Sequence, residues 1–139
     1  MTPRAVMDTN VLYAALRSSA GASFAVVEAL KRGRWKLVLS NTVLAEYEEV
    51  LKREASALQL TFAESDRALD ALCALAERIR LTESWTPLLT DSDDEAFAHL
   101  AVEARVGYLV SHNLRHLEPV RTLGVKLLEP RQFLAILPP

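Results

Sequence analysis

Short apolar runs alternate with longer segments of helical periodicity along the whole chain. Four runs have the length and composition of buried strands, namely Arg4–Met7, Trp35–Leu39, Tyr108–Val110 and Val125–Leu128. Between these runs, apolar residues recur at spacings of three and four, which is typical of amphipathic helices. Strands that alternate with helices predict a parallel sheet with helices on both of its faces.

The helical periodicity also predicts where the helices lie. The predicted helical segments are Val11–Leu16, Ala22–Arg32, a helix that follows the cap cluster Ser40–Thr42 and carries Val43 to Leu51, Phe62–Ile79, Asp91–Arg105 and a terminal helix that opens at Pro130. A further extended piece is predicted at Arg80–Thr82. We find no internal repeat, low-complexity segment or second hydrophobic unit, so residues 1–139 are expected to form one domain.

Polar residues follow the first and third of these strands. Asp8 comes directly after the first strand, Asn113 follows the third, and Asp94 begins the helix that leads into that third strand. Right-handed crossovers bring the carboxyl ends of such strands to one edge of the sheet, where α/β proteins bind ligands. Asp8 could instead cap the next helix, but Thr9 or Asn10 could take that role and leave Asp8 free.

The helix that begins near Asp91 opens on several carboxylates. Acidic side chains at a helix start cap the helix and complement its dipole, which accounts for Asp91 and Asp93. Asp94 lies one turn before Phe97, at the start of the apolar stripe, where an unpaired charge is costly. Because a bound metal ion would account for an inward carboxylate, capping and metal binding both remain open for this segment.

A further carboxylate comes from the helix that follows Ser40–Thr42. Glu46 and Glu48 lie at the two margins of its apolar stripe, so the periodicity does not choose between them. Glu49 points away from the stripe and is predicted to be solvated. The expected group of side chains is therefore Asp8, Asp94, Asn113 and one of these two glutamates.

Composition limits the classes of ligand and location. The chain has 139 residues, of which 50% are hydrophobic and 24% charged, as in ordinary globular proteins. Its net charge of −2 gives no strong attraction to nucleic acid, so such a ligand would require a local basic patch or metal ions.

Cys73 is the single cysteine and cannot form an internal disulfide. The N-terminal apolar run is too short for a signal peptide or a membrane span, so we expect a cytoplasmic protein without a membrane partner.

Converging carboxylates favour metal chemistry. Carboxylates without cationic partners repel one another unless a cation lies between them. Oxygen ligands of this kind favour Mg²⁺ or Mn²⁺, and such ions activate water and stabilise charge on a phosphoryl group. The predicted group of side chains therefore suits hydrolysis of phosphodiester bonds.

Other chemistries lack their motifs. His112 and His116 are four residues apart, but no Glu follows His112 as the zinc-protease motif requires, so both are interpreted as surface or supporting residues. His99 is interpreted as a surface residue. The sequence contains neither a Gly-x-Ser-x-Gly elbow nor a phosphate-binding glycine loop.

The chain resembles the PIN-domain family, in the branch that comprises VapC-like ribonucleases, the toxins of toxin–antitoxin pairs. The segments that carry the resemblance are Val6–Leu12, Leu44–Leu51, Asp91–Asp94 with the helix after it, Leu109–Asn113 and Gly124–Leu134. Each motif is short, but their order and spacing together are fairly specific, and they span nearly the whole chain.

The resemblance implies a three-layer α/β/α fold with a five-stranded parallel sheet, and an endoribonuclease that uses Mg²⁺ or Mn²⁺ to cleave RNA. The family's acids fall on Asp8, Glu46 and Asp94, which selects Glu46 over Glu48. Asp91 matches a commonly acidic position nearby and is the second choice in that loop.

The resemblance also implies supporting residues and partners. The family's fourth acid falls on Asn113, a departure that weakens the expected second metal position. Ser111 and Asn10 match positions that support the site by hydrogen bonding. A cognate antitoxin protein and a homodimer are implied as partners.

Two alternatives use a similar fold. One is an RNA-binding or scaffold protein in which Asn113 has weakened catalysis. The other is a phosphorylated receiver domain, which requires an acidic pair after the first strand. Because Asp8 is followed by Thr9 and Asn10, we set the receiver domain aside.

Overall fold

Five parallel strands form one sheet at the centre of the molecule. The computed structural model describes residues 2–82 and 84–139. The strands are β1 (Arg4–Met7), β2 (Lys36–Leu39), β3 (Glu77–Arg78), β4 (Tyr108–Val110) and β5 (Lys126–Leu128). They lie in the order β3-β2-β1-β4-β5, and each neighbouring pair is parallel. The predicted five-stranded parallel sheet is confirmed.

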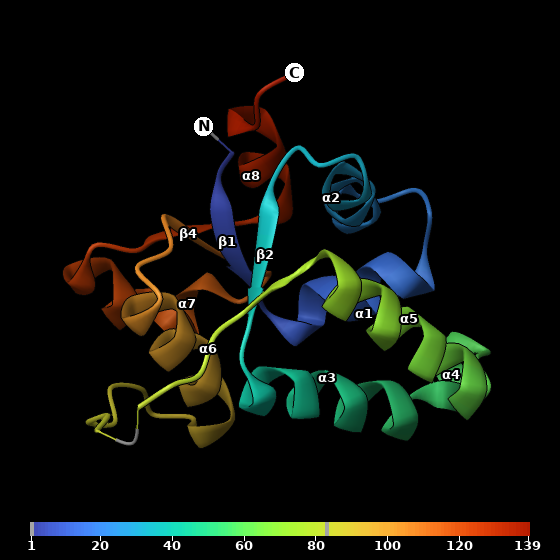
Figure 1. The fold of residues 1–139 in the computed structure, drawn as a ribbon, viewed down its shortest axis with the longest axis horizontal. Coiled ribbons are helices and arrows are strands. Elements are labelled where there is room, and N and C mark those ends of the chain that lie inside the picture. Colours follow the sequence, from blue (N-terminus) through green and yellow to red (C-terminus); the bar gives the residue numbers. More distant parts are fainter. Residues whose placement is uncertain (1, 83) are drawn as a thin grey trace.

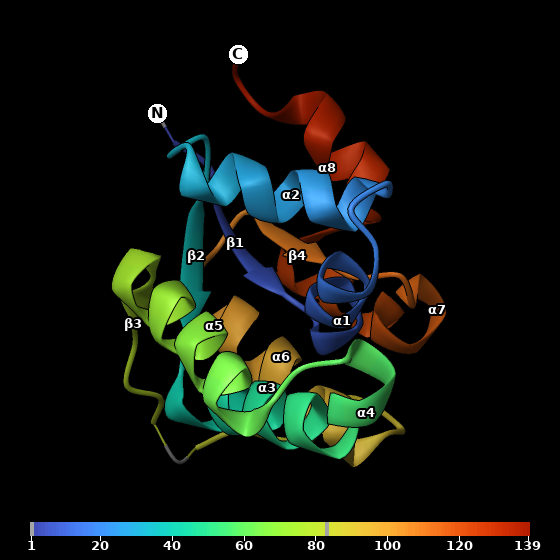
Figure 2. The ribbon, with the colours of Figure 1, turned by 90° about the vertical axis from the view of Figure 1, so that its right-hand side faces the viewer.

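Helices cover both faces of this sheet. They are α1 (Thr9–Arg17), α2 (Ala22–Lys31), α3 (Asn41–Arg53), α4 (Ala55–Leu58), α5 (Phe62–Leu75), α6 (Ser92–Glu103), α7 (Leu114–Leu117), the 3-10 helix η1 (Glu118–Leu123) and α8 (Pro130–Ile136). Figures 1 and 2 show α6 on one side of the strands and α1 and α2 on the other. This arrangement is the predicted three-layer α/β/α fold. Among residues 2–82 and 84–139, no helix is long and apolar enough to cross a membrane.

The inner strands are mostly apolar because both faces of the sheet are covered. Val6, Leu39 and Val110 are fully buried, as expected for strands between two helical layers. Trp35 packs edge-on against Phe133 of α8, with ring centroids 5.2 Å apart. The last helix is thereby joined to the same core as the first strands.

Helix α3 is fixed at the carboxyl end of β1. The Ser40 hydroxyl caps α3 by accepting a hydrogen bond from the Val43 N–H at 3.2 Å. Tyr47 is fully buried, and its hydroxyl donates a hydrogen bond to the carbonyl oxygen of Met7. Because Met7 ends β1, this bond holds the adjacent Glu46 near the end of that strand.

The third strand lies where the periodicity predicts helix. The predicted helix Phe62–Ile79 ends at Leu75. The extended piece predicted at Arg80–Thr82 was wrong, because the strand, β3, lies at Glu77–Arg78. Two interactions with distant residues stabilise β3, namely its parallel pairing with β2 and the ion pair between Arg4 and Glu77 at 2.6 Å. Periodicity within the segment does not report such long-range contacts.

Candidate metal centre

Three elements bring carboxylates to one pocket at the carboxyl end of β1. Asp8 follows β1, Glu46 projects from α3, and Asp94 lies in the first turn of α6. All three line a single pocket of about 160 Å³. The carboxylates that were predicted from distant parts of the sequence therefore converge in the fold.

Asp8 is held in place by a hydrogen-bond network from β4. Asp8 is 6% exposed, and its carboxylate accepts a hydrogen bond from the Ser111 hydroxyl at 2.7 Å. The Ser111 oxygen in turn accepts from the Asn10 amide at 3.3 Å and from the Asn113 backbone N–H at 2.9 Å. Asn10 also accepts the His112 backbone N–H at 3.2 Å. Ser111 thus contacts Asp8 directly, and Asn10 contacts Ser111.

The pocket disfavours the charged forms of the three carboxylates. Burial raises the pKa of Asp8, although the Ser111 hydrogen bond opposes it, and burial also raises the pKa of Glu46. Burial, followed by the charges of Asp8 and Asp91, raises the pKa of Asp94 to about 6. A divalent cation would offset this accumulated negative charge. Because the ligands are carboxylate oxygens, the pocket fits Mg²⁺ or Mn²⁺.

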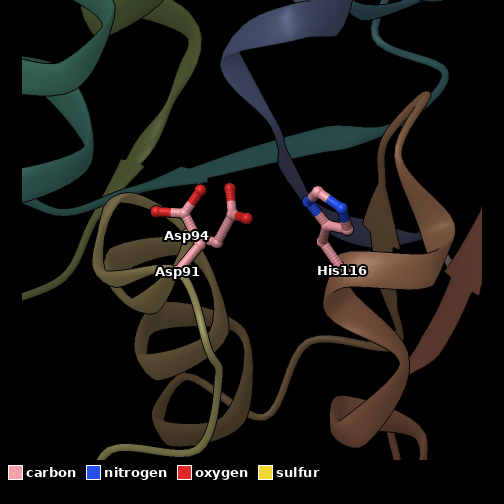
Figure 3. Close-up of side chains that lie close together, drawn as sticks. All are labelled: Asp91, Asp94 and His116. Carbon is pink, nitrogen blue, oxygen red and sulfur yellow. The ribbon is translucent and has the colours of Figure 1, made fainter.

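Asp91 caps α6 and also belongs to a second group of potential metal ligands. Its carboxylate accepts the Asp93 backbone N–H at 2.9 Å, as expected for an N-cap residue. Asp91, Asp94 and His116 each offer one potential ligand atom, and these atoms lie within 4.8 Å of one another (Figure 3). His116 comes from α7 and was predicted only as a surface or supporting residue, so the sequence did not reveal its place here.

Asn113 contacts His116 rather than lining the carboxylate pocket. It is the N-cap residue of α7, but its side chain makes no capping hydrogen bond. Its Nδ2 lies 3.0 Å from Nδ1 of His116. The Asn113 side chain therefore does not cap α7, and its amide contacts the imidazole that lies near Asp91 and Asp94.

The pocket also contains side chains that the sequence did not single out for it. Asp93, interpreted as a capping residue, lines the pocket together with Arg53. Glu49 is 65% exposed, as predicted, but it lines the pocket as well and lies 3.8 Å from Arg53. Among the described residues that line this pocket, Arg53 provides the one permanent positive charge.

The prediction that His99 lies on the surface was wrong. Its side chain is 14% exposed and stacks on Trp85, with ring centroids 4.6 Å apart. Its Nε2 also lies 3.0 Å from the carboxylate of Glu103. The loop that precedes α6 covers the face of the helix on which His99 lies, and periodicity within the helix does not indicate this cover.

The same loop is attached to the first turn of α6. The Glu95 carboxylate accepts hydrogen bonds from the Trp85 indole and the Leu88 backbone N–H, both at 2.8 Å, and from the Leu89 N–H. Burial raises the pKa of Glu95, but these hydrogen bonds outweigh it and bring the pKa below its ordinary value. Glu95 thereby fixes the helix turn that carries Asp94.

Comparison with known proteins agrees with this fold. A family model described as the PIN domain matches residues 4–115. No curated protein sequence matches the chain. The chain is similar to a chain in the crystal structure of VapBC2 from Rickettsia felis bound to a DNA fragment of the VapBC2 promoter. The two chains are 16% identical and superpose with a TM-score of 0.65. This match covers 91% of the present chain and 98% of the other.

A second solved structure, PAE2754 from Pyrobaculum aerophilum, is 15% identical and superposes with a TM-score of 0.60. The match covers 96% of the present chain and 88% of that one. At these identities the two structures share the fold of this chain. Since the family model spans most of the sequence, the chain belongs to the PIN-domain family.

Proposed function

We propose that this protein is a divalent-metal-dependent endoribonuclease in which Asp8, Glu46 and Asp94 hold the metal. The observation that carries the proposal is that carboxylates from β1, α3 and α6 meet in one pocket, each with a raised pKa. Nothing in the hydrophobic core requires such a group of like charges, whereas a cation site does. Membership of the PIN-domain family supports a nuclease.

The residues of the chain have separate roles in this reaction. Mg²⁺ or Mn²⁺, when bound, lowers the pKa of water and stabilises charge that develops on the phosphoryl group. The Ser111 hydroxyl donates a hydrogen bond to Oδ2 of Asp8 and so fixes the orientation of this carboxylate. Asn10 holds Ser111 in place. Arg53, at the edge of the pocket, is placed to attract an RNA phosphate.

The proposal extends to biological context. The Rickettsia felis structure contains VapBC2 with promoter DNA. With the PIN-domain fold, this likeness supports a toxin of a type II toxin–antitoxin pair, with a cognate antitoxin and a homodimer as partners. We propose the cytoplasm as its location, where RNA is accessible.

Cleavage of single-stranded RNA by purified variants tests the proposal. Asp8→Asn should lower the cleavage rate in Mn²⁺ about 100-fold or more, because loss of residues that only support metal ligands already costs roughly 10- to 100-fold. Glu48→Gln is the matched control, since Glu48 is an exposed neighbour of Glu46 on α3, and it should retain wild-type activity. Wild-type protein that binds RNA but never cleaves it would favour the RNA-binding alternative.

A further inference from the structure

A second group of ligands adjoins the carboxylate pocket and includes a nitrogen donor. Asp91 and Asp94 come from the start of α6, and His116 comes from α7. Their ligand atoms lie within 4.8 Å of one another, a spacing at which one cation can contact all three. Figure 3 shows the imidazole turned toward the two carboxylates. This donor set is mixed, unlike the oxygen ligands of the first pocket.

These ligands are accessible from solution. Asp91 and His116 line a cavity of about 640 Å³ together with Thr90, Arg115 and Pro119. Asp94 lines the carboxylate pocket. A cation that entered the large cavity would therefore lie next to the first metal position and would share Asp94 with it.

Asn113 contacts the imidazole of His116. Its Nδ2 lies 3.0 Å from Nδ1 of His116, and both side chains are exposed. In a neutral imidazole one ring nitrogen carries the proton and the other keeps a lone pair, through which a cation binds. Where the Asn113 amide donates to Nδ1, a cation at this nitrogen has to displace only one solvent-accessible hydrogen bond.

We propose that Asp91, Asp94 and His116 form a second cation position, which takes a transition-metal ion such as Mn²⁺ in preference to Mg²⁺. The inference rests on the proposed function only in that Asp94 is shared between the two positions. Imidazole nitrogen suits transition metals, whereas Mg²⁺ is bound through oxygen and gives up its water reluctantly. His116 therefore supplies, from α7, a ligand in place of the acid that the family resemblance expects at Asn113.

Pulsed electron paramagnetic resonance of Mn²⁺ bound to the full chain, without RNA, tests this position. Wild-type protein should show coupling between Mn²⁺ and a histidine nitrogen, and labelling the histidines with a heavy nitrogen isotope should change that coupling. His116→Gln should abolish the coupling and weaken Mn²⁺ binding at this position about tenfold or more. Binding of Mg²⁺ should stay unchanged.

His112→Gln is the matched control. His112 lies on the same segment, but its ring pairs with Ser23 at 2.7 Å and is not part of the cluster. This variant should retain the nitrogen coupling. Bound Mn²⁺ without nitrogen coupling in the wild type, or coupling that persists in His116→Gln, would overturn the inference.

The outcome is separable from that of the proposed function. Wild-type protein that cleaves RNA in Mn²⁺ but shows no nitrogen coupling would contradict the His116 position alone. Coupling that depends on His116, in a protein without nuclease activity, would contradict the ribonuclease and leave the cation position standing. Because the isotope measurement uses wild-type protein, it still tests for a histidine ligand if His116→Gln does not fold, and His112→Gln then shows whether His112 is the source of the coupling.

Discussion

Asp94 is the residue at which the two groups of ligands meet. It lines the pocket with Asp8 and Glu46, and its carboxylate also lies close to Asp91 and His116. Burial and the nearby carboxylates raise its pKa to about 6. Without a cation, the ionised form of Asp94 therefore destabilises the folded protein at neutral pH.

Replacing Asp94 with Asn should stabilise the metal-free protein at pH 7. A raised pKa means that Asp94 favours folding at pH values below 3.8, its ordinary pKa, and that this contribution is lost as the pH rises through about 6. Asp94→Asn should raise the free energy of unfolding by about 1 kcal/mol at pH 7, because solvent screening reduces the effect for a partly exposed group.

Urea unfolding in the presence of a chelator measures this difference. The two proteins should differ at pH 7 and have equal stability below pH 3.8, where the wild-type carboxyl is also neutral. A variant less stable than the wild type at pH 7 would show that the Asp94 carboxylate makes favourable interactions in the free protein.

Asn113 gives a second prediction at the scale of single residues. Asn113→Asp would replace a neutral amide next to His116 with a negative charge that has no hydrogen to donate. Since carboxylates contribute much of the affinity of such sites, Mn²⁺ should bind about tenfold more tightly. Titration calorimetry on both proteins measures the change, and equal affinity and stoichiometry would remove Asn113 from the metal centre.

At the scale of elements, the first turn of α6 depends on the loop before it. Glu95→Ala leaves the Trp85 indole and two backbone N–H groups without their acceptor, so the free energy of unfolding should fall by about 1–3 kcal/mol. Since the pKa of Glu95 is lowered, this difference should be present at pH 7 and decline as the pH falls below 4.5.

Hydrogen exchange locates the effect of Glu95→Ala. The amides of Leu88 and Leu89 should exchange faster in the variant. Exchange of the Val43 amide, on α3, should change by no more than the fall in the free energy of global unfolding accounts for. Unchanged protection of the two leucine amides would mean that the loop is held by contacts other than Glu95.

Burial determined which elements the sequence could reveal. Strands β1, β2, β4 and β5 lie between two helical layers, so they consist of apolar runs and were predicted close to their true positions. Strand β3 has two residues, Glu77 and Arg78, and lies at the edge of the sheet, so it has no such run. Its position depends on the free edge of β2 and on Arg4, which lies far away in the sequence.

The candidate site was predictable to the extent that it follows from strand topology. Asp8, Glu46 and Asp94 converge because the parallel strands end on one edge of the sheet and α3 and α6 are adjacent there. His116 could not be predicted, since α7 has four residues, too few for a periodic pattern, and its place depends on packing against α6. Arg53 lies at the far end of α3 and likewise has no local signal.

At the scale of the whole molecule, a cation should link the three elements that meet at the pocket. A ligand that binds only the folded state stabilises it by mass action, by about 2.7 kcal/mol at ~100 times its dissociation constant. Millimolar Mn²⁺ should therefore raise the melting temperature of the wild type in scanning calorimetry. Asp8→Asn should lose most of this increase, whereas Glu48→Gln should retain it.

The net charge of −2 makes the cation important for substrate binding as well as for stability. An RNA phosphate that approaches Asp8, Glu46 and Asp94 would be repelled by the metal-free pocket. A divalent ion offsets much of this negative charge and attracts phosphate oxygens directly, so the metal is expected to be required before the phosphodiester can reach the site.

The metal dependence of RNA cleavage tests the central claim most directly. End-labelled single-stranded RNA is incubated with purified wild-type protein in Mn²⁺, in excess chelator, and in chelator followed by renewed Mn²⁺. We predict cleavage in the first sample, none in the second and restored cleavage in the third, with Asp94→Asn inactive throughout. Cleavage that persists in chelator, or that is equally fast in Asp94→Asn, would contradict a metal-dependent ribonuclease built on Asp8, Glu46 and Asp94.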